Sequence, residues 1–491
     1  MRVPLSCWCI SVEQMRRTNI AHMIMSSRTC SLPRFWSRWQ SVVVLTVTFT
    51  FSQLDRQMLT VVAPTLGREL KLSDGQLGVL MGVMFAVFYS MFGLPIGHLV
   101  DRYSRKSLLL VSLAVWTTGT FCSGLARSFA SLALWRIIVA VGEAGGNPIA
   151  YSIISDVFPE NQRSTPIAVY HLGIYLAALA KSLVPPLTDA IGWHRAFQVV
   201  GAAGLVPIAL VAATLVEPTR GAQDRCRDDG PRHASSPADE ANRTPTAWAT
   251  ATTLWRTRGF PTLTIAMGVT TFVSFGVHAW LPSYLGRLAG DQPHTGSALG
   301  ARLFMVELPG LAGVLLGGWL PDTLAQRSQR AQRGRWRFAG KQWIAIVPAV
   351  ANTLHGFFLL GATLSGYEVA SVYFACANFA NGMRMAAPIT LSQELADARS
   401  RGVAAAIVVV SANVIGQGGG PTLLGLLSSS LRPLCGEVDA LRYAMLLVFP
   451  AASALAAALF SAVAMLMPQR DSDLTQLVAS STSSTAPDER E

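Results

Sequence analysis

The stretch GHLVDRYSRK, residues 97–106, decides the fold because a diluted copy of it, GWLPDTLAQR, occurs at residues 318–327. Both copies carry the pattern G-x-L-x-D, and each directly follows an apolar run at the same place in its half of the chain. A second spacing recurs in the same way, with an arginine seven positions after an acid: Asp156 and Arg163, Glu394 and Arg401. Patterns that return at equivalent positions predict two related halves made by internal duplication.

The composition places these halves in a membrane. Of 491 residues, 51% are hydrophobic and 14% are charged, whereas about a quarter of the residues of a soluble domain are charged. The net charge of +11 comes mainly from arginines between apolar runs, which favours membrane orientation over binding of nucleic acid. Seven scattered cysteines form no disulfide framework or metal-ligand spacing, and the sequence has no HExxH motif, so we expect no metal and no cofactor.

Twelve apolar stretches are long enough to cross a hydrocarbon core about 30 Å thick. A polar segment rich in Arg, Asp, Pro and Ser separates six from six and is typical of a flexible linker. The predicted spans are 41–64, 75–99, 107–126, 130–155, 165–190, 196–216, 259–286, 298–320, 342–364, 367–391, 402–430 and 441–467. The predicted domains are a basic cytoplasmic N-terminal segment (1–40), a six-helix bundle (41–216), a cytoplasmic linker (217–258), a second six-helix bundle (259–467) and a disordered cytoplasmic tail (468–491).

The distribution of basic residues predicts the orientation. With the N-terminus in the cytoplasm, cytoplasmic segments contain 27 Lys and Arg, and the segments on the other side contain 8. The positive-inside rule therefore predicts a multi-pass protein of the inner (plasma) membrane with both termini in the cytoplasm. The first forty residues hold six arginines and no apolar core with a cleavage site, so we expect no cleaved signal peptide; Met23 or Met25 is an alternative start.

The motif at 97–106 resembles the loop G-x-x-x-D-R-x-G-R-[KR] of the major facilitator superfamily, with Ser104 in place of the glycine. Three further stretches resemble the bacterial spinster-like branch of that family: LDRQ (54–57), ARSFASLALWRIIVAVGEAGGNP (126–148) and SDVFPENQR (155–163). The resemblance implies an all-α fold of twelve transmembrane helices in two pseudo-symmetric six-helix bundles. It also implies that the first and fourth spans are neighbours, and it associates the chain with proton coupling and with relatives that export lysolipids or sphingoid phosphates.

Two full charges, Asp55 and Arg56, interrupt the first span, where each unpaired charge would cost about 2.5 to 3.5 kcal/mol. At 1.5 Å per residue, Asp55 lies roughly 13 Å below the outer surface, and Arg136 in the fourth span lies roughly 10 Å below it. The matching depths predict an ion pair. We interpret Asp55 as a protonatable carboxylate whose ionised form pairs with Arg136, because burial favours the neutral acid and a nearby cation favours the charged one. The alternative is a static buried network that joins the two spans.

Glu143 follows Arg136 by two helical turns and projects from nearly the same face of the fourth span. It is a candidate second proton site or the partner of Arg56. Arg56 points about 100° away from Asp55 around its helix, so it does not neutralise that residue directly. The other candidate role of Arg56 is to receive an anionic head group.

By resemblance, the loop at 97–106 is a cytoplasmic latch that stabilises an outward-open state. Gly97 would permit close helix approach, Asp101 would accept hydrogen bonds from a neighbouring helix N-terminus, and Arg105 would reach the region of Asp156. The remaining members of this predicted gating cluster are Arg102, Lys106 and Arg163. The alternative role is a topological anchor in which positive charge holds the loop at the membrane edge.

Other polar residues inside spans are candidates for the wall of a cavity: Lys181, Glu307, Arg384 and Asn413. Lys181 either marks the charge of the substrate or extends its ammonium group toward the outer interface. His278 and His355 are isolated, and we interpret them as hydrogen-bonded core or interface residues.

These features predict a monomeric secondary carrier that works by alternating access and moves a small or amphipathic organic solute, with protons as the coupling ion. The sequence lacks a GxxxxGK[ST] loop, so we do not expect ATP to drive it. By family analogy the substrate is a lysolipid or another amphipathic anion. A multidrug or organic-anion carrier is the close alternative, and a nontransporting receptor or a membrane-embedded enzyme is the alternative from another class. We expect no enzymatic activity, because the scattered histidines and cysteines supply no convergent catalytic groups.

Overall fold

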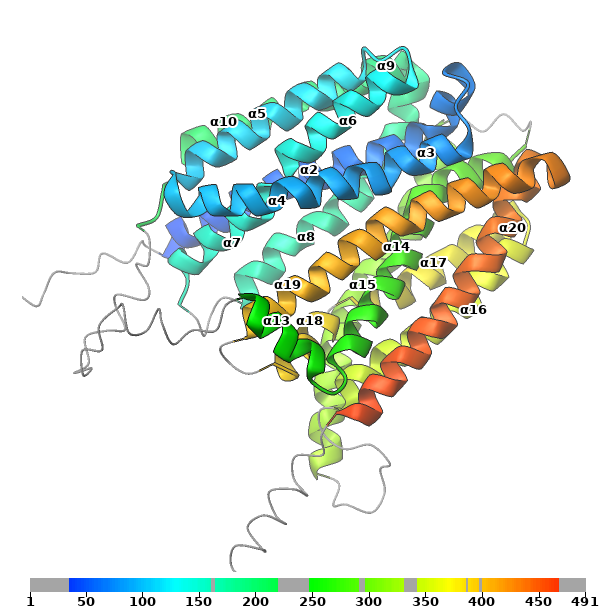
Figure 1. The fold of residues 1–491 in the computed structure, drawn as a ribbon. Coiled ribbons are helices and arrows are strands. Elements are labelled where there is room, and N and C mark those ends of the chain that lie inside the picture. Colours follow the sequence, from blue (N-terminus) through cyan, green and yellow to red (C-terminus); the bar gives the residue numbers. More distant parts are fainter. Residues whose placement is uncertain are drawn as a thin grey trace, which may run out of the picture.

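The computed structural model describes residues 35–159, 164–219, 247–290, 296–330, 342–385, 387–396 and 400–467. Within these residues the regular structure is helical, and no strand occurs among them. The helices form two groups that follow each other in the sequence and lie side by side (Figure 1). The expectation of an all-α protein in two bundles is confirmed.

The first half contains the helices α2 (Phe35–Glu69), α3 (Asp74–Met81), α4 (Val83–Arg102), α5 (Arg105–Ser123), α6 (Phe129–Glu143), α7 (Gly146–Val157), α8 (Ser164–Ala180), the 3₁₀ turn η2 (Lys181–Leu183), α9 (Val184–Ala203) and α10 (Leu205–Thr214). The second half contains α13 (Ala247–Arg256), α14 (Phe260–Leu288), α15 (Gly296–Arg330), α16 (Trp343–Leu364), α17 (Tyr367–Met383), α18 (Ala387–Glu394), α19 (Arg401–Ser411), the π-helical segment η4 (Ala412–Gly419) and α20 (Gly420–Leu466).

Seven helical stretches of the described chain are long and apolar enough to cross a membrane. Two of them, Thr165–Thr214 and Gly402–Leu466, each contain two of the predicted spans. Their helices break at Gly192 (φ 77°) and Gly436 (φ 81°), where glycine tolerates a positive φ because it has no Cβ. The other predicted spans correspond to α2, α5 and the pair α17 and α18, which are shorter or more polar, so the architecture is consistent with twelve spans.

Serine residues explain where two of the helices begin. Ser73 caps α3 by accepting a hydrogen bond from the backbone of Gln76, whose side chain accepts one from the backbone of Ser73 in return. Ser104 caps α5 by accepting a hydrogen bond from the backbone of Ser107. A serine at this position satisfies an N–H that would otherwise lack a partner at the helix start. The departure from the family glycine at Ser104 therefore has a structural role.

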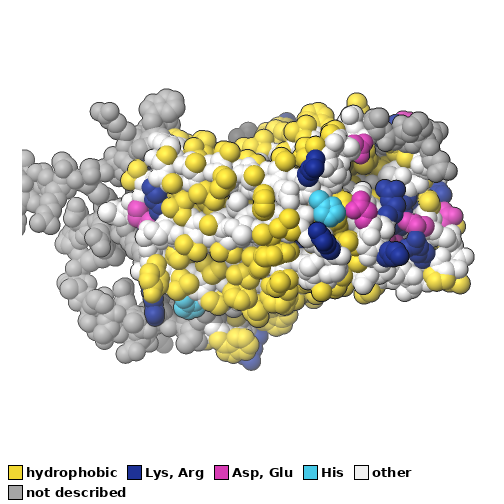
Figure 2. All heavy atoms as spheres, turned by 90° about the horizontal axis from the view of Figure 1, so that it is seen from above, with side chains coloured by type: hydrophobic (Ala, Val, Ile, Leu, Met, Phe, Trp, Pro, Cys, Tyr) yellow, Lys and Arg dark blue, Asp and Glu magenta, His cyan; other side chains and the backbone are white. Residues whose placement is uncertain are grey.

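The outer surface of the bundle is apolar, as expected for a protein that faces lipid. In Figure 2, hydrophobic side chains dominate the middle of the face, whereas charged side chains gather toward its ends. Large exposed apolar side chains occur on helices of both halves, among them Val87, Val111, Leu315, Val372 and Leu447. A soluble protein seldom exposes such continuous apolar surface, so this face is suited to a bilayer.

The described part of the segment predicted as a flexible linker includes the helix α13. Leu254 of α13 is buried and belongs to a cluster with Phe260 and Val408. On the same helix, Trp248 and Trp255 are exposed. Tryptophan favours the boundary between lipid and water, so α13 presents a face suited to that boundary.

The two halves contact each other along part of their length. We call the end of the bundle that holds the turn between α2 and α3 the far end, and the end that holds the turn between α4 and α5 the linker end. Contacts between the halves join α3 to α20, α2 to α14, and α15 to α8, η2 and α9. At Gly78 of α3 a Cβ would lie 2.6 Å from the carbonyl oxygen of Pro421, so these two helices meet backbone to backbone.

Candidate functional site

Asp55 and Arg136, which the depth estimate predicts to pair, are in contact inside the first half. Arg136 Nη1 lies 3.0 Å from Asp55 Oδ2, and the side chains are 2% and 1% exposed. The hydroxyl of Thr120 on α5 donates to Asp55 Oδ1 over 2.9 Å. Both carboxylate oxygens thus have partners, and the ion pair joins α2 to α6 while α5 supplies the third contact.

Arg56 pairs with Glu143, which was one of its two predicted roles. Arg56 Nε lies 2.5 Å from Glu143 Oε2. The guanidinium also lies 4.7 Å from the ring centroids of both Phe85 and Tyr89 on α4. The faces of these aromatic rings attract the positive charge of Arg56. Arg136 lies 5.8 Å from the same Phe85 ring, so one aromatic side chain links the two pairs.

A cavity opens beside this cluster of four charges. Arg56 and Glu143 form part of its wall, and Tyr89, Asn147 and Tyr170 add polar groups. The amide of Asn147 donates to the Tyr89 hydroxyl over 3.1 Å, and the Tyr170 hydroxyl donates to Asn147 Oδ1 over 2.8 Å. Sequence reasoning missed these three residues, and the signal for Asn147 is its position about one helical turn beyond Glu143 in the glycine-rich GEAGGNP run.

The cluster is not fully hydrogen-bonded. Among the described residues, Glu143 Oε1 and Arg136 Nε have no hydrogen-bond partner although both atoms are buried. An unpaired buried carboxylate oxygen is costly, so this atom is an open position for a proton or a polar group. Glu143 therefore differs from Asp55, whose two oxygens are both occupied.

At the linker end, Arg105 forms the contact that the sequence predicts. Its guanidinium pairs with Asp156, donates to Ser152 O over 3.2 Å and to Pro218 O over 2.6 Å, and lies 3.0 Å from Glu217. Arg105 is buried and joins α5, α7 and the segment after α10. Lys106 donates from Nζ to the carbonyl of Ala212 over 2.8 Å.

Glu217 is the residue of this cluster that sequence reasoning missed. Its carboxylate accepts hydrogen bonds from the backbone of Arg105 and Lys106, over 3.1 and 2.7 Å, and from the Ser104 hydroxyl over 2.8 Å. Partial burial opposes ionisation of Glu217, but these bonds outweigh it and hold its pKa below the ordinary value. A carboxylate at the start of α5 is also favoured by the helix dipole, so Glu217 fills the role predicted for Asp101.

Four predicted gating residues remain: Gly97, Asp101, Arg102 and Arg163. The side chain of Asp101 and the whole of Arg163 lie outside the described residues. Arg102 is exposed at the end of α4. The close helix approach predicted for Gly97 is absent in this conformation, since a Cβ there would meet no described atom within 4 Å, and the same holds for Gly318 in the repeated copy.

Lys181 and Glu307 form an ion pair between the two halves. Lys181 Nζ lies 2.5 Å from Glu307 Oε1, and the side chains are 0% and 3% exposed. His278 Nε2 lies 3.5 Å from Glu307 Oε2, and the Asn378 amide donates to the same oxygen over 2.8 Å. The alternative in which Lys181 extends toward the outer interface is wrong for this conformation. His278, interpreted from the sequence as a hydrogen-bonded core or interface residue, belongs to this cluster, and its Nδ1 lies 2.7 Å from Ser274 O.

The other two candidate cavity residues lie elsewhere in the second half. Arg384 is fully buried and donates to the side-chain oxygens of Asn352 and Asn381. Neutral amide oxygens thus solvate its charge in the described structure. Asn413 is half-buried in the π-helical segment η4.

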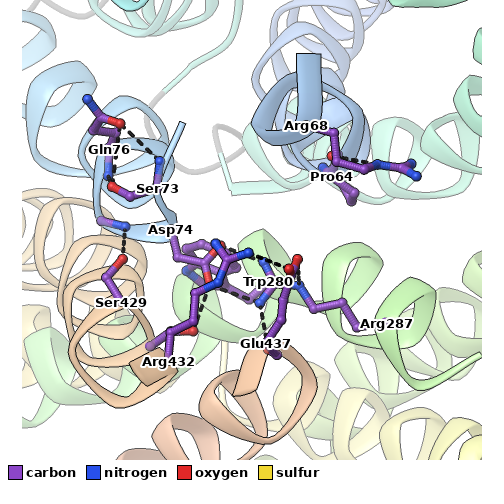
Figure 3. A network of polar contacts seen from close by, with 12 residues as sticks. Pro64, Arg68, Ser73, Asp74, Gln76, Trp280, Arg287, Ser429, Arg432 and Glu437 are labelled. Atoms are coloured by element: carbon purple, nitrogen blue, oxygen red, sulfur yellow. Dashed lines mark hydrogen bonds and ion pairs between the residues drawn. The ribbon is translucent and has the colours of Figure 1, made fainter. Parts of the chain in front are cut away.

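A second ion pair between the halves closes the far end (Figure 3). Arg287 of α14 donates from both terminal nitrogens to Asp74 of α3, over 2.8 and 2.5 Å. Ser428 of α20 donates to Asp74 Oδ2 over 2.7 Å, and Arg287 also reaches the carbonyl of Glu437 over 3.2 Å. Sequence reasoning missed this pair, because an acid in the first turn of a helix is already accounted for by the helix dipole.

These contacts and the arrangement of the helices define a class of protein. Two related helical halves in a membrane, with buried ion pairs inside one half and across the interface, form the architecture of a secondary transporter. The profile of the Major Facilitator Superfamily matches residues 45–421, and the chain belongs to this superfamily of transporters.

Individual relatives agree with this assignment. The chain is 29% identical over 425 residues to an MFS-type efflux pump of Mycolicibacterium smegmatis, which covers 84% of this chain and 89% of the relative. It is 27% identical over 431 residues to protein spinster homolog 1 of Homo sapiens, covering 83% of this chain and 77% of the relative. Its fold matches the crystal structure of a bacterial homolog of the human lysosomal transporter spinster, in an inward-facing and unoccupied conformation, with a TM-score of 0.68 at 23% identity over 88% of this chain and 96% of that one.

Proposed function

We propose that this protein moves a small or amphipathic organic solute across the membrane by alternating access, with proton movement linked to the four charges Asp55, Arg56, Arg136 and Glu143. The observation that carries the proposal is the pair of adjacent buried ion pairs beside a cavity, one of which leaves a carboxylate oxygen open. Ionisable residues inside spans are costly and are retained for function more often than for stability.

Each pair supplies a different step. A proton that enters through the cavity reaches Glu143 Oε1 first, because that atom has no partner in the described structure while both oxygens of Asp55 are bonded. Protonation of Glu143 removes the charge that neutralises Arg56, which is 16% exposed. The freed guanidinium then has a free hydrogen-bonding face for the anionic group of a solute. Protonation of Asp55 would release Arg136 in the same way and loosen the joint between α2 and α6.

The conformation supports alternating access. Two ion pairs and a backbone-close contact hold the halves together at the far end. At the linker end, the glycines of both repeated loops face open space. The described chain therefore corresponds to a state closed at the far end, and the proposed cycle requires a second state in which the linker-end loops close.

The substrate class rests on the relatives and on charge. The chain resembles proteins named as an efflux pump and as spinster homologues. A lysolipid or another amphipathic anion would place its charged group on Arg56 and its apolar part along the apolar wall of the cavity. A multidrug or organic-anion carrier is the second candidate, and a receptor that binds without transport is the candidate from another class.

We further propose that the protein lies in the inner (plasma) membrane as a monomer, with the linker end and both termini in the cytoplasm. The support is the excess of basic residues in the segments on that side, which include the linker.

The test is solute counterflow in liposomes with a panel of lysolipids and organic anions, followed by uptake driven by a pH gradient. We expect Asp55→Asn to keep counterflow but to lose the dependence on the gradient, because the neutral amide cannot exchange a proton. The matched control is Arg68→Gln, which removes an exposed charge at the end of the same helix. Full gradient-driven transport by Asp55→Asn would show that this carboxylate does not carry the coupling proton, and binding without counterflow would favour the receptor.

A further inference from the structure

The break between α8 and α9 places a lysine from the first half inside the second. Pro185 and Pro186 have no N–H with which to bond the carbonyls of Lys181 and Ser182, so the helix tightens into the 3₁₀ turn η2 at this point. The Lys181 side chain extends from that turn and is completely buried against Glu307 of α15. Glu307 lies eleven positions after Gly296, the first residue of α15, and so roughly 16 Å along the helix from that residue.

The backbone of η2 lies directly on α15. A Cβ at Gly300 would lie 2.2 Å from Ser182 O, and a Cβ at Gly296 would lie 2.4 Å from Pro185 O. The spacing of these two glycines is the G-x-x-x-G pattern that permits close helix approach in membranes. Because the contact has no side chains between the backbones, separation of the halves at the far end must withdraw η2 together with the Lys181 ammonium.

Withdrawal of Lys181 leaves Glu307 in a polar pocket of the second half. Its remaining neighbours come from separate helices: His278 of α14 at 3.5 Å, Asn378 of α17 at 2.8 Å, and His355 of α16 in the wall of the same cavity. Tyr175 of α8 also interacts electrostatically with Glu307. His355 Nδ1 is buried and has no hydrogen-bond partner among the described residues. Lys181 is thus the cation in direct contact with this carboxylate, and the other facing groups are imidazoles, an amide and a phenol.

We propose that Glu307 is a second proton-binding site of the carrier, which holds the Lys181 ammonium while the far end is closed and a proton while it is open. The proposal rests on the alternating-access cycle proposed above. A buried carboxylate that has lost its cation and keeps only neutral polar neighbours is unfavourable in its ionised form, and it relieves this cost by taking up a proton. One O–H bond forms on Glu307 as one O–H bond of a hydronium ion breaks and leaves water, so the protein gains one proton. Lys181 leaves with its three N–H bonds intact.

The proposal predicts a pH-dependent conformational equilibrium in the absence of solute. If the open state binds one proton more than the closed state, the ratio of open to closed molecules rises up to about tenfold for each unit by which the pH falls. The measurement uses nitroxide labels on Lys71→Cys and Leu434→Cys, two exposed far-end positions on opposite halves, in a chain whose native cysteines are replaced by serine. Electron–electron distance distributions in lipid nanodiscs give the ratio from pH 8 to pH 5.

Four variants separate the possible outcomes. Glu307→Gln should remove the change of up to tenfold per pH unit in the ratio of open to closed molecules. Lys181→Met should weaken this pH dependence as well, because the carboxylate then lacks its ammonium partner in both states. The double variant Lys181→Met/Glu307→Gln contains no unpaired charge, so it keeps the test valid if either single variant fails to fold. Asp74→Asn is the matched control, since it removes the carboxylate of the other pair between the halves and should keep the contribution of Glu307.

An unchanged pH dependence in Glu307→Gln and in the double variant would overturn the proposal, as would a wild-type protein with no pH dependence at all. The result is independent of transport. If Asp55→Asn transports normally while Glu307→Gln loses the pH dependence, the proposed role of Asp55 fails and that of Glu307 stands. If Asp55→Asn loses gradient-driven transport while Glu307→Gln keeps the pH dependence, the proposed role of Glu307 is wrong and that of Asp55 stands.

Discussion

The ion pair between Asp74 and Arg287 offers the most direct measurement of what holds the far end closed. Removal of one partner of a fully buried ion pair costs about 3 to 5 kcal/mol. Three features lower this cost for the present pair. The Arg287 side chain is slightly exposed. If Arg287 is removed, Asp74 keeps the hydrogen bond from Ser428 and its place at the start of α3, and if Asp74 is removed, Arg287 still donates to the carbonyl of Glu437. We therefore expect a coupling free energy of about 2 kcal/mol between the two side chains, which is roughly a 30-fold change in the ratio of open to closed molecules.

The experiment is a double-mutant cycle of Asp74→Asn, Arg287→Gln and the double variant, with the labels on Lys71→Cys and Leu434→Cys as the readout. Arg68→Gln is a suitable control, because among the described residues Arg68 donates within its own helix, to Pro64 O over 3.3 Å (Figure 3). A coupling free energy below about 0.5 kcal/mol would mean that the pair contributes equally to both states, and the idea of a clamp at the far end would then be wrong.

Two further predictions concern the contact of η2 with α15 and the capping of α5. Gly300→Ala should open the far end and slow transport severalfold, because its Cβ would collide with Ser182 O. The control is Gly286→Ala, whose Cβ would meet no described atom within 4 Å and which should leave transport unchanged. Equal behaviour of the two variants in the distance and transport assays would contradict the close packing. Glu217→Gln should lower the free energy of unfolding by about 1 kcal/mol at neutral pH, since its hydrogen bonds to the start of α5 are charge-assisted but partly exposed to solvent. Because the pKa of Glu217 is depressed in the folded state, this stabilisation is present above its ordinary pKa and is lost as the pH falls through the depressed value, so thermal unfolding of wild type and variant should converge in acid. A difference that stays constant from pH 7 to pH 3.5 would show that the charge of Glu217 is not the source.

The part of the site that lies within one half could be predicted from the sequence. Asp55 and Arg136 pair because their depths match, and the depth of a residue in a span follows from the fixed rise per residue of a helix. Glu143 lies on the face of Arg136 for the same reason, and the pair with Arg56 is one of the two roles that the sequence left open for it. Residues of the same cavity without charge, such as Tyr89 and Asn147, carry no such signal, because tyrosine and asparagine are also common as packing and capping residues.

The sequence by itself determined the membrane class, two halves and a buried charge cluster, because hydrophobic length, an internal repeat and the cost of a charge in lipid are local properties of the chain. Only the tertiary structure decided which charges meet across the halves. Lys181 finds Glu307, and Asp74 finds Arg287, through the relative rotation and translation of two bundles, which no periodicity within one helix encodes. The same rigid-body arrangement decides which end of the carrier is closed, since in a two-state transporter the helices stay nearly the same while the contacts between the halves change.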